Sequence, residues 1–207
     1  MQKLLIATTN PAKLSELSQF LSDLPVKLVS LKDLGINRKA PEIGRTFVQN
    51  AIGKARFYFN ISGLPTIADD GGLEIAAFGG EPGVASHRLP ESDREATDRE
   101  LIDHTLARIR KLPETERDAQ LRLVLVLFLP NGKIHVSQAR VQGIIPNQPS
   151  SHTTAGFPYR SLLFIPQLHK FYNEAELTPE EDLKYNHRRK AVEKLKPIIK
   201  KYLISND

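Results

Sequence analysis

Apolar and polar positions in the first part of the chain alternate between short hydrophobic runs and stretches with helical spacing. Residues 3–8 are typical of a buried strand. Asn10-Pro11 then marks a helix start, with Asn10 as N-cap and Pro11 in the first turn. A second strand is expected over residues 26–30. The next helix is expected from Thr46, where residues 46–49 fit a capping box.

The remaining pattern predicts a mixture of strands, one hairpin and two more helices. In chain order we expect a short strand over 65–68, an acidic turn over 68–72, a strand over 73–77, a polar helix capped by Ser92, strand 121–129, a hairpin turn into strand 134–141, a loop over 146–158 and a final helix over 188–203. Strands that alternate with helices and then form a hairpin indicate an α/β protein with a mixed sheet.

Composition narrows the class of protein. With 207 residues and 40% apolar residues, the chain can bury an ordinary core, and we treat 1–207 as one domain without drawing an internal boundary. The absence of cysteine excludes a disulfide framework and favours Mg²⁺, Mn²⁺ or Ca²⁺ over structural zinc at any metal site. No apolar run is long enough for a signal peptide or a membrane span, so we expect a cytoplasmic protein.

The formal charge of +5 comes largely from basic residues near the C-terminus. This crowding suggests either an anionic partner or the solvated face of a terminal helix.

A first candidate site is the run Thr8-Thr9-Asn10-Pro11-Ala12-Lys13, which leads from a strand into a helix with a lysine in its first turn. Free backbone N–H groups, the helix dipole and the Lys13 ammonium suit a phosphate group. A capped helix is also commonplace, and the run lacks the glycines of a P-loop.

The acidic run Asp69-Asp70-Gly71-Gly72 is a second candidate, because adjacent carboxylates at a strand end repel each other unless a cation or donors compensate. Glu42 precedes the second helix, and Asn50 and Lys54 share one helical face. Since Mg²⁺ takes one or two protein carboxylates plus water and substrate phosphates, Glu42 with either aspartate fits a magnesium site. A plain surface turn and a plain helix surface are the alternatives.

A third group lies near the C-terminus. The rings of Phe157 and Tyr159 can stack on a base, and Lys184, His187 and Arg188 can donate hydrogen bonds to it. The alternatives are that the rings belong to the core and that His187 is structural.

Taken together, these stretches resemble the inosine triphosphate pyrophosphatase family. The motifs that carry the resemblance are Thr8-x-Asn10-x-x-Lys13-x-x-Glu16, Glu42-x-Gly44-x-Thr46-Phe47-x-x-Asn50-Ala51-x-x-Lys54-Ala55, Ala68-Asp69-Asp70-x-Gly72-Leu73 and Gly79-Gly80-x-Pro82-Gly83-Val84-x-Ser86-x-Arg88. They occur in the same order as in the family.

The resemblance implies a two-lobed α/β fold with a long central mixed sheet flanked by helices, a substrate cleft between the lobes, and a homodimer. It implies Mg²⁺-dependent hydrolysis of ITP, dITP and XTP to monophosphate and pyrophosphate, with Mn²⁺ as a possible substitute. The roles that it implies are phosphate binding by Thr8, Thr9, Asn10, Lys13 and Lys54, metal binding by Glu42, Asp70 and Asp69, and base catalysis by Asp70. Sequence alone does not separate the two aspartates.

The C-terminal third departs from the family pattern. An acidic residue of the family is Arg160 here, and the family's Ser-His-Arg element is Asn186-His187-Arg188. Base binding by Phe157, Tyr159, Arg160, Lys184, His187 and Arg188 is therefore less well founded than phosphate chemistry. Two alternatives follow: a pyrophosphatase of altered or relaxed base specificity, and a nucleotide- or nucleic-acid-binding protein without catalysis. For the enzyme we expect a nucleoside triphosphate substrate, no membrane and no stable nucleic-acid partner.

Overall fold

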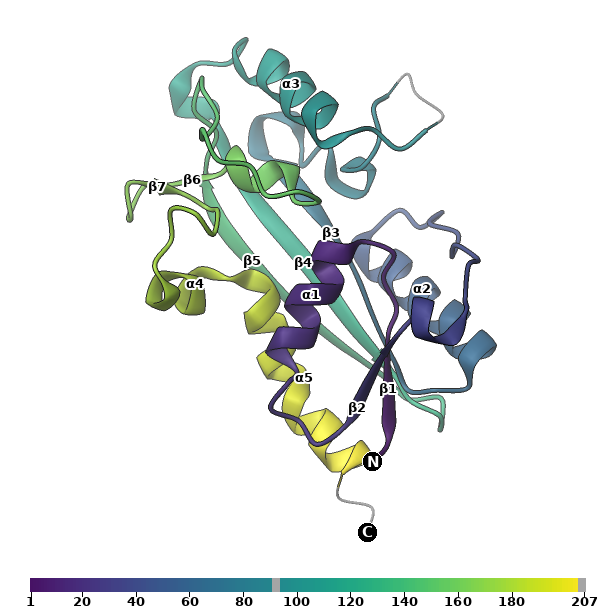
Figure 1. Ribbon diagram of the computed structural model, residues 1–207. Coiled ribbons are helices and arrows are strands. Elements are labelled where there is room, and N and C mark those ends of the chain that lie inside the picture. Colours follow the sequence, from purple (N-terminus) through teal and green to yellow (C-terminus); the bar gives the residue numbers. More distant parts are fainter. Residues whose placement is uncertain (91–93, 205–207) are drawn as a thin grey trace. The chain divides into compact units, whose positions relative to one another are not determined.

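The computed structural model describes residues 1–90 and 94–204, and Ser92, the predicted helix cap, lies outside this range. The helices are α1 (Pro11–Phe20), α2 (Phe47–Ser62), α3 (Asp98–Ile109), α4 (Pro179–Tyr185) and α5 (His187–Leu203). The strands are β1 (Lys3–Ile6), β2 (Lys27–Ser30), β3 (Thr66–Ile75), β4 (Asp118–Phe128), β5 (Ile134–Ile144), β6 (Phe164–Ile165) and β7 (Lys170–Phe171), and Figure 1 shows their course.

The strands form one sheet in the order β2-β1-β3-β4-β5-β6-β7. β1 is parallel to β2 and to β3, whereas β6 is antiparallel to β5 and β7. β4 and β5 are neighbours joined by a tight turn in which the Gly132 N–H donates to the Leu129 carbonyl, a connection too short for a parallel pair. The α/β class with a mixed sheet is confirmed.

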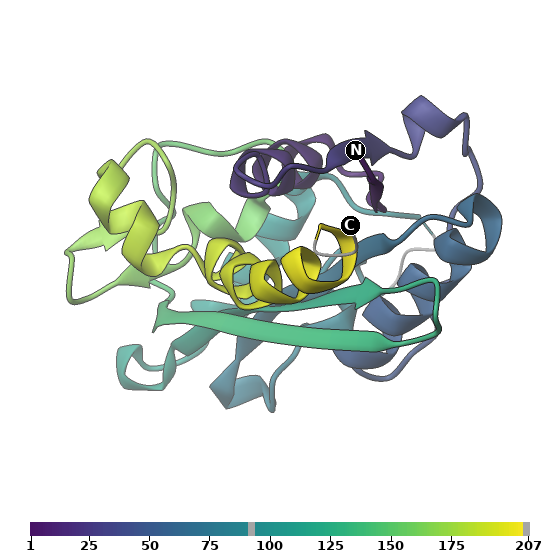
Figure 2. The ribbon, with the colours of Figure 1, turned by 90° about the horizontal axis from the view of Figure 1, so that it is seen from below.

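The chain divides into two compact units. Unit 1 comprises residues 1–70, 123–139 and 188–207, and unit 2 comprises residues 71–122 and 140–187. In unit 1, α1 and α5 pack on one face of the sheet in a core with Leu4, Ile6 and Leu125, while α2 packs on the other face with Leu5 and Val124 (Figure 2). Alternate strand residues thus supply the two cores.

Unit 2 has its own core. Leu73 and Ile75 of β3 pack there with apolar residues of α3, and Leu162 and Leu163 complete the cluster. Separate apolar clusters explain why the two units are each compact.

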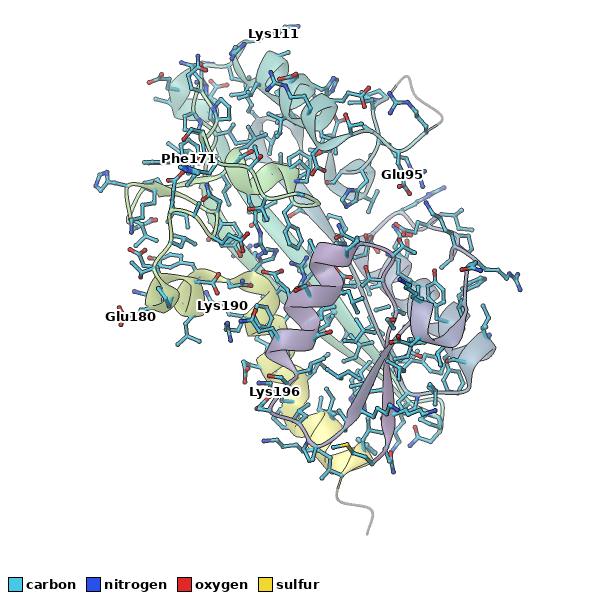
Figure 3. The ribbon with its side chains drawn as sticks, in the orientation of Figure 1. Glu95, Lys111, Phe171, Glu180, Lys190 and Lys196 are labelled. Atoms are coloured by element: carbon cyan, nitrogen blue, oxygen red, sulfur yellow. The ribbon has the colours of Figure 1, made fainter. Side chains whose placement is uncertain are left out.

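The basic C-terminus forms α5. Lys190 is exposed, and Lys196 pairs with Asp23 and Glu193 at 2.9 and 2.6 Å (both lysines are labelled in Figure 3). This agrees with the interpretation of the basic residues as the solvated face of a terminal helix. The described residues contain no helix that is both long and apolar enough to cross a membrane.

The acidic turn predicted over residues 68–72 is wrong, because these residues lie inside the continuous strand β3. Gly72 permits this course: a Cβ atom there would lie 2.0 Å from the Ser86 Oγ. The backbone at Gly72 is therefore approached closely by a serine of the same unit.

The start of α3 and the cap of α2 also differ from the sequence prediction, whereas the start of α2 at Thr46 is confirmed. α3 begins after Thr97, which forms a capping box with Glu100, so the predicted cap at Ser92 is too early. At α2, Thr46 accepts from the Gln49 N–H at 3.2 Å, but the Gln49 side chain accepts from the Arg45 N–H and the box is not reciprocal. Helix α4 and the short strands β6 and β7 were not expected from the sequence.

Candidate active site

Parallel pairing of β1 and β3 brings the first two candidate motifs together in unit 1. Leu5 is in register with Thr66 and Ile6 with Ile67, and the Ala7 N–H donates to the Ile67 carbonyl at 2.7 Å. Because parallel strands point the same way, the segment that follows β1 meets the aspartates that follow Ile67 in β3.

Asn10 shapes the start of α1. Its Oδ1 accepts from the N–H groups of Ala12 and Lys13 at 2.9 and 3.1 Å, which confirms the predicted N-cap. The Thr8 Oγ1 accepts from the Asn10 N–H at 3.2 Å, and Thr9 is exposed. This local geometry fixes the backbone from which the Lys13 side chain extends.

Asp69 is a buried anion held by cations from two helices. Its side chain is 1% exposed, and its Oδ2 lies 3.1 Å from the Lys13 Nζ and 3.7 Å from the Arg188 Nη2. Burial alone would raise the pKa of Asp69, but the charges of Lys13, Arg188 and Lys54 outweigh it and hold the pKa well below its usual range. Asp69 is therefore a permanent counterion.

Helix α2 turns Asn50 and Lys54 inward. The Lys54 Nζ lies 2.8 Å from the Glu42 Oε1 and donates to the Asp69 carbonyl at 3.0 Å. Burial alone would lower the pKa of Lys54. The negative charges of Asp69 and Glu42 outweigh this effect, so the pKa lies above its usual value. The interpretation of Asn50 and Lys54 as ordinary surface residues is wrong.

Asp70 differs from its neighbour in having no ion pair among the described residues. It is 4% exposed, its side chain is hydrogen-bonded to Asn50, and its Oδ2 is buried without a hydrogen-bond partner. Burial raises the pKa of Asp70 to about 6, although Lys54 and Asn50 act in the opposite direction. A buried carboxylate oxygen without a donor is suited to a cation or to a proton.

The carboxylates at this position fit a magnesium ion whose remaining ligands are substrate phosphates and water. The described residues contain no group of three or more histidine or acidic side chains that could hold a metal alone. Mg²⁺ needs only one or two protein carboxylates when phosphates and water supply the other ligands. Glu42 and the unpartnered Asp70 oxygen are carboxylate donors of this kind, and Glu42 contributes to the electrostatic environment of Asp70.

The charged cluster is rich in carboxylates. It comprises the cations Lys13, Lys54 and Arg188 and the carboxylates Glu16, Glu42, Asp69 and Asp70, in which Arg188 also pairs with Glu16. One carboxylate is in excess when all are ionised. The net negative charge of the cluster would therefore attract an added cation. Lys13 and Lys54 could then pair with a polyanion in place of the carboxylates.

Several predicted base-binding residues of unit 2 make contacts with aromatic side chains. The Arg160 guanidinium lies 4.0 Å from the centre of the Phe157 ring and 5.3 Å from that of Tyr172. The His187 Nδ1 lies 2.9 Å from the Tyr172 hydroxyl, and Tyr159 donates to the Ser86 carbonyl at 2.6 Å. Tyr159 thus belongs to the core, as one sequence interpretation holds.

Two other predicted base-binding residues make different contacts. Lys184 is exposed on α4, with its ammonium 5.5 Å from the Tyr185 ring centre. Arg188 belongs to unit 1, where it contacts Glu16 and Asp69. Base binding by these residues stays a prediction.

Sequence reasoning did not assign Asn50 and Glu16 to the site. Asn50 was recognisable as a neighbour of Lys54 on one helical face, and Glu16 lies one helical turn after Lys13 in the opening motif. The contact of Arg188 with Glu16 spans 172 positions of sequence and leaves no local signal.

Comparison with known proteins assigns the chain to a family. Residues 4–198 match the Ham1 family. The chain is 40% identical to a dITP/XTP pyrophosphatase of Thermus thermophilus, over 93% of this chain and 89% of the relative. It is 37% identical to a dITP/XTP pyrophosphatase of Escherichia coli strain K12, over 94% of this chain and 96% of the relative.

Solved structures agree with this assignment. A HAM1 protein from Coxiella burnetii has a TM-score of 0.83 and 31% identity, over 97% of this chain and all of that one. A nucleoside-triphosphatase/dITP/XTP pyrophosphatase from Mycobacterium abscessus has a TM-score of 0.74 and 35% identity, over 95% of this chain and 100% of that one. On the evidence of sequence and fold, the chain belongs to the Ham1 family.

Proposed function

We propose that this protein is a Mg²⁺-dependent nucleoside triphosphate pyrophosphatase that hydrolyses dITP, ITP and XTP to monophosphate and pyrophosphate. The observation that carries the proposal is the pair of adjacent buried aspartates with different electrostatics: the Asp69 Oδ2 is paired with two cations, while the buried Asp70 Oδ2 has neither a hydrogen bond nor an ion pair among the described residues. The names of the dITP/XTP pyrophosphatases to which the chain is similar support the substrate class.

The phosphate chain binds at the beginning of α1 and along α2. Lys13 and Lys54 supply ammonium groups, and Thr8, Thr9 and Asn10 supply polar groups before the helix, where the helix dipole favours anions. Lys54 exchanges its contact with Glu42 for a phosphate oxygen. Asp69 keeps the Lys13 side chain in place through their ion pair.

Asp70 takes the proton of the attacking water. A carboxylate with a pKa of about 6 is a stronger base than an exposed aspartate and is still largely ionised at neutral pH. Water attacks the α phosphorus, the bond to the bridging oxygen breaks, and pyrophosphate leaves. Glu42 and Asp70 would hold Mg²⁺, or Mn²⁺ in its place, and the bound metal would supply neutralisation of phosphate charge.

The test is to incubate purified protein with Mg²⁺ and a panel of nucleoside triphosphates and to identify the products. We expect monophosphate and pyrophosphate from dITP, ITP and XTP. Asp70→Asn should lower kcat by at least about 100-fold, the lower end of the contribution of a general base. Release of orthophosphate and diphosphate, or polynucleotide binding without turnover, would overturn the proposal.

Altered or relaxed base specificity is a second candidate, and Arg160 is the observation that favours it. Its buried guanidinium lies against Phe157 and Tyr172, and it can only donate hydrogen bonds, whereas an ionised acidic residue can only accept them. Arg160→Met should then change the ratio of kcat/KM between nucleotides. A strong preference of the wild-type protein for ITP and XTP over ATP, GTP and pyrimidine triphosphates would exclude this candidate.

The family resemblance also supports a cytoplasmic homodimer that functions as a single domain over residues 1–207. Sedimentation velocity across a range of protein concentrations tests the assembly. A monomer at every concentration would contradict it.

A further inference from the structure

The loop that carries Glu42 is attached to one face of α2. We call residues 36–45 the Glu42 loop; it contains no helix or strand and most of its residues are exposed, including Ile43 at 90%. Because the loop buries little apolar surface, hydrogen bonds from α2 have a large share in fixing its position.

Three residues of α2 at successive helical turns contact this loop. Asn50 accepts from the Gly44 N–H at 2.7 Å, and Lys54 pairs with Glu42 at 2.8 Å. The Tyr58 hydroxyl donates to the Arg38 carbonyl at 3.1 Å and accepts from the Ala40 N–H at 3.2 Å. The loop therefore runs antiparallel to the helix, and Glu42 lies between two points of attachment.

Tyr58 is the attachment point farthest from the proposed chemistry. Its ring is 2% exposed in the unit 1 core, so its position is set by packing and its hydroxyl is presented at a fixed point. That hydroxyl pairs with the Arg38 carbonyl and with the Ala40 N–H, which lie on either side of residue 39. Without the hydroxyl these two backbone groups would need other hydrogen-bond partners.

The opposite end of the loop is held by close contact. A Cβ atom on Gly44 would lie 2.6 Å from the Asn50 Oδ1 and 2.7 Å from the Gln49 Cβ. Any larger residue there must push the loop away from α2. This gives a second, independent way to disturb the position of Glu42 without changing Glu42 or Lys54.

We propose that Tyr58 is a positioning residue for the Glu42 carboxylate and acts through the backbone of the Glu42 loop. The inference rests on the proposed function, in which Glu42 binds the metal. Tyr58 touches neither substrate nor metal. Its hydroxyl limits the positions that the loop can occupy, so that Glu42 is already in place when the metal and nucleotide arrive.

The experiment compares Tyr58→Phe with the wild-type protein. The variant keeps the ring and removes only the hydroxyl. Hydrogen–deuterium exchange should become faster in the Glu42 loop and stay unchanged in β3. The variant loses both hydrogen bonds of the hydroxyl. The Mg²⁺ concentration that half-saturates dITP turnover should therefore rise by at least about fivefold, the effect of losing one neutral hydrogen bond, with a smaller change in kcat at saturating Mg²⁺.

Thr66→Val is the matched control. Thr66 is also fully buried, and its hydroxyl donates to the Leu64 carbonyl at 2.8 Å without contact to the Glu42 loop. It should lose comparable stability and leave loop exchange and Mg²⁺ dependence as in the wild type. Equal shifts in Thr66→Val and Tyr58→Phe, or none in Tyr58→Phe, would overturn the inference.

Two further variants separate the possible failures. If Tyr58→Phe does not fold, Gly44→Ala tests the same dependence on loop position, and an unchanged Mg²⁺ requirement in that variant counts against the inference. Glu42→Gln should itself raise the Mg²⁺ requirement. If Glu42→Gln has no effect, or if the wild type has no turnover, the proposed function fails and not the role of Tyr58 alone.

Discussion

Replacing Asp70 by asparagine should make the metal-free protein more stable at alkaline pH while it strongly lowers activity. Burial raises the pKa of Asp70 from 3.8 to about 6. A difference of about two pKa units corresponds to about 3 kcal/mol of folding free energy. Because the folded pKa lies above the unfolded one, this contribution is complete below pH 3.8 and is lost as the pH rises through about 6.

The assay is urea unfolding of wild type and Asp70→Asn in EDTA, followed by far-ultraviolet circular dichroism. At about pH 8 the variant should be more stable by about 3 kcal/mol, and the difference should nearly vanish at about pH 4. Comparing the two proteins at each pH cancels the titration of all other groups. The same difference at both pH values, or a less stable variant at alkaline pH, would refute the reasoning.

Asp69→Asn is the control with the opposite sign. The pKa of Asp69 lies below 3.8, so its ionised form stabilises the fold above that pH, and the contribution is lost as the pH falls below it. The variant leaves Lys13 and Arg188 near a neutral side chain. It should lose about 3–5 kcal/mol at about pH 8, the usual cost of breaking a buried pair. Gains in both variants would show that the electrostatic environments of the two aspartates do not differ.

Two further substitutions test the packing and the charges of the site. Gly72→Ala places a methyl group 2.0 Å from the Ser86 Oγ. This overpacking should lower the free energy of unfolding in urea by about 1–3 kcal/mol, and an unchanged unfolding midpoint would contradict the close approach. Arg188→Met leaves Glu16 and Asp69 without a buried guanidinium and should cost about 3–5 kcal/mol at about pH 8, so a loss below about 1 kcal/mol would show that solvent compensates these charges.

Elements whose cause is local could be predicted from the sequence. Asn10 caps α1 because its side-chain oxygen can reach the free N–H groups of the two residues at positions 12 and 13. This contact depends only on neighbouring residues. The start of α2 at Thr46 and the early strands follow from equally local patterns. The same holds for Lys54, whose place four residues after Asn50 put both on one helical face.

Features that depend on distant residues could not be predicted. An acidic, glycine-rich stretch has the composition of a turn, and the close approach of the distant Ser86, which leaves no room for a Cβ at position 72, has no local signal. The pKa values of Asp69 and Asp70 diverge because cations surround one and burial dominates the other. The contact of Arg188 with Glu16 could not be predicted, because the position of Arg188 next to His187 gives no local signal of it.

The ion pair between Lys54 and Glu42 has a consequence for the order of binding. A metal ion that arrives alone must compete with an ammonium group 2.8 Å from the carboxylate oxygen, and Lys54 would lose that partner. A triphosphate that arrives with the metal offers Lys54 a new anion as Glu42 changes partner. Under the proposed function each ligand lowers the cost of binding the other, and by thermodynamic linkage we expect the metal and the nucleotide to bind with positive cooperativity.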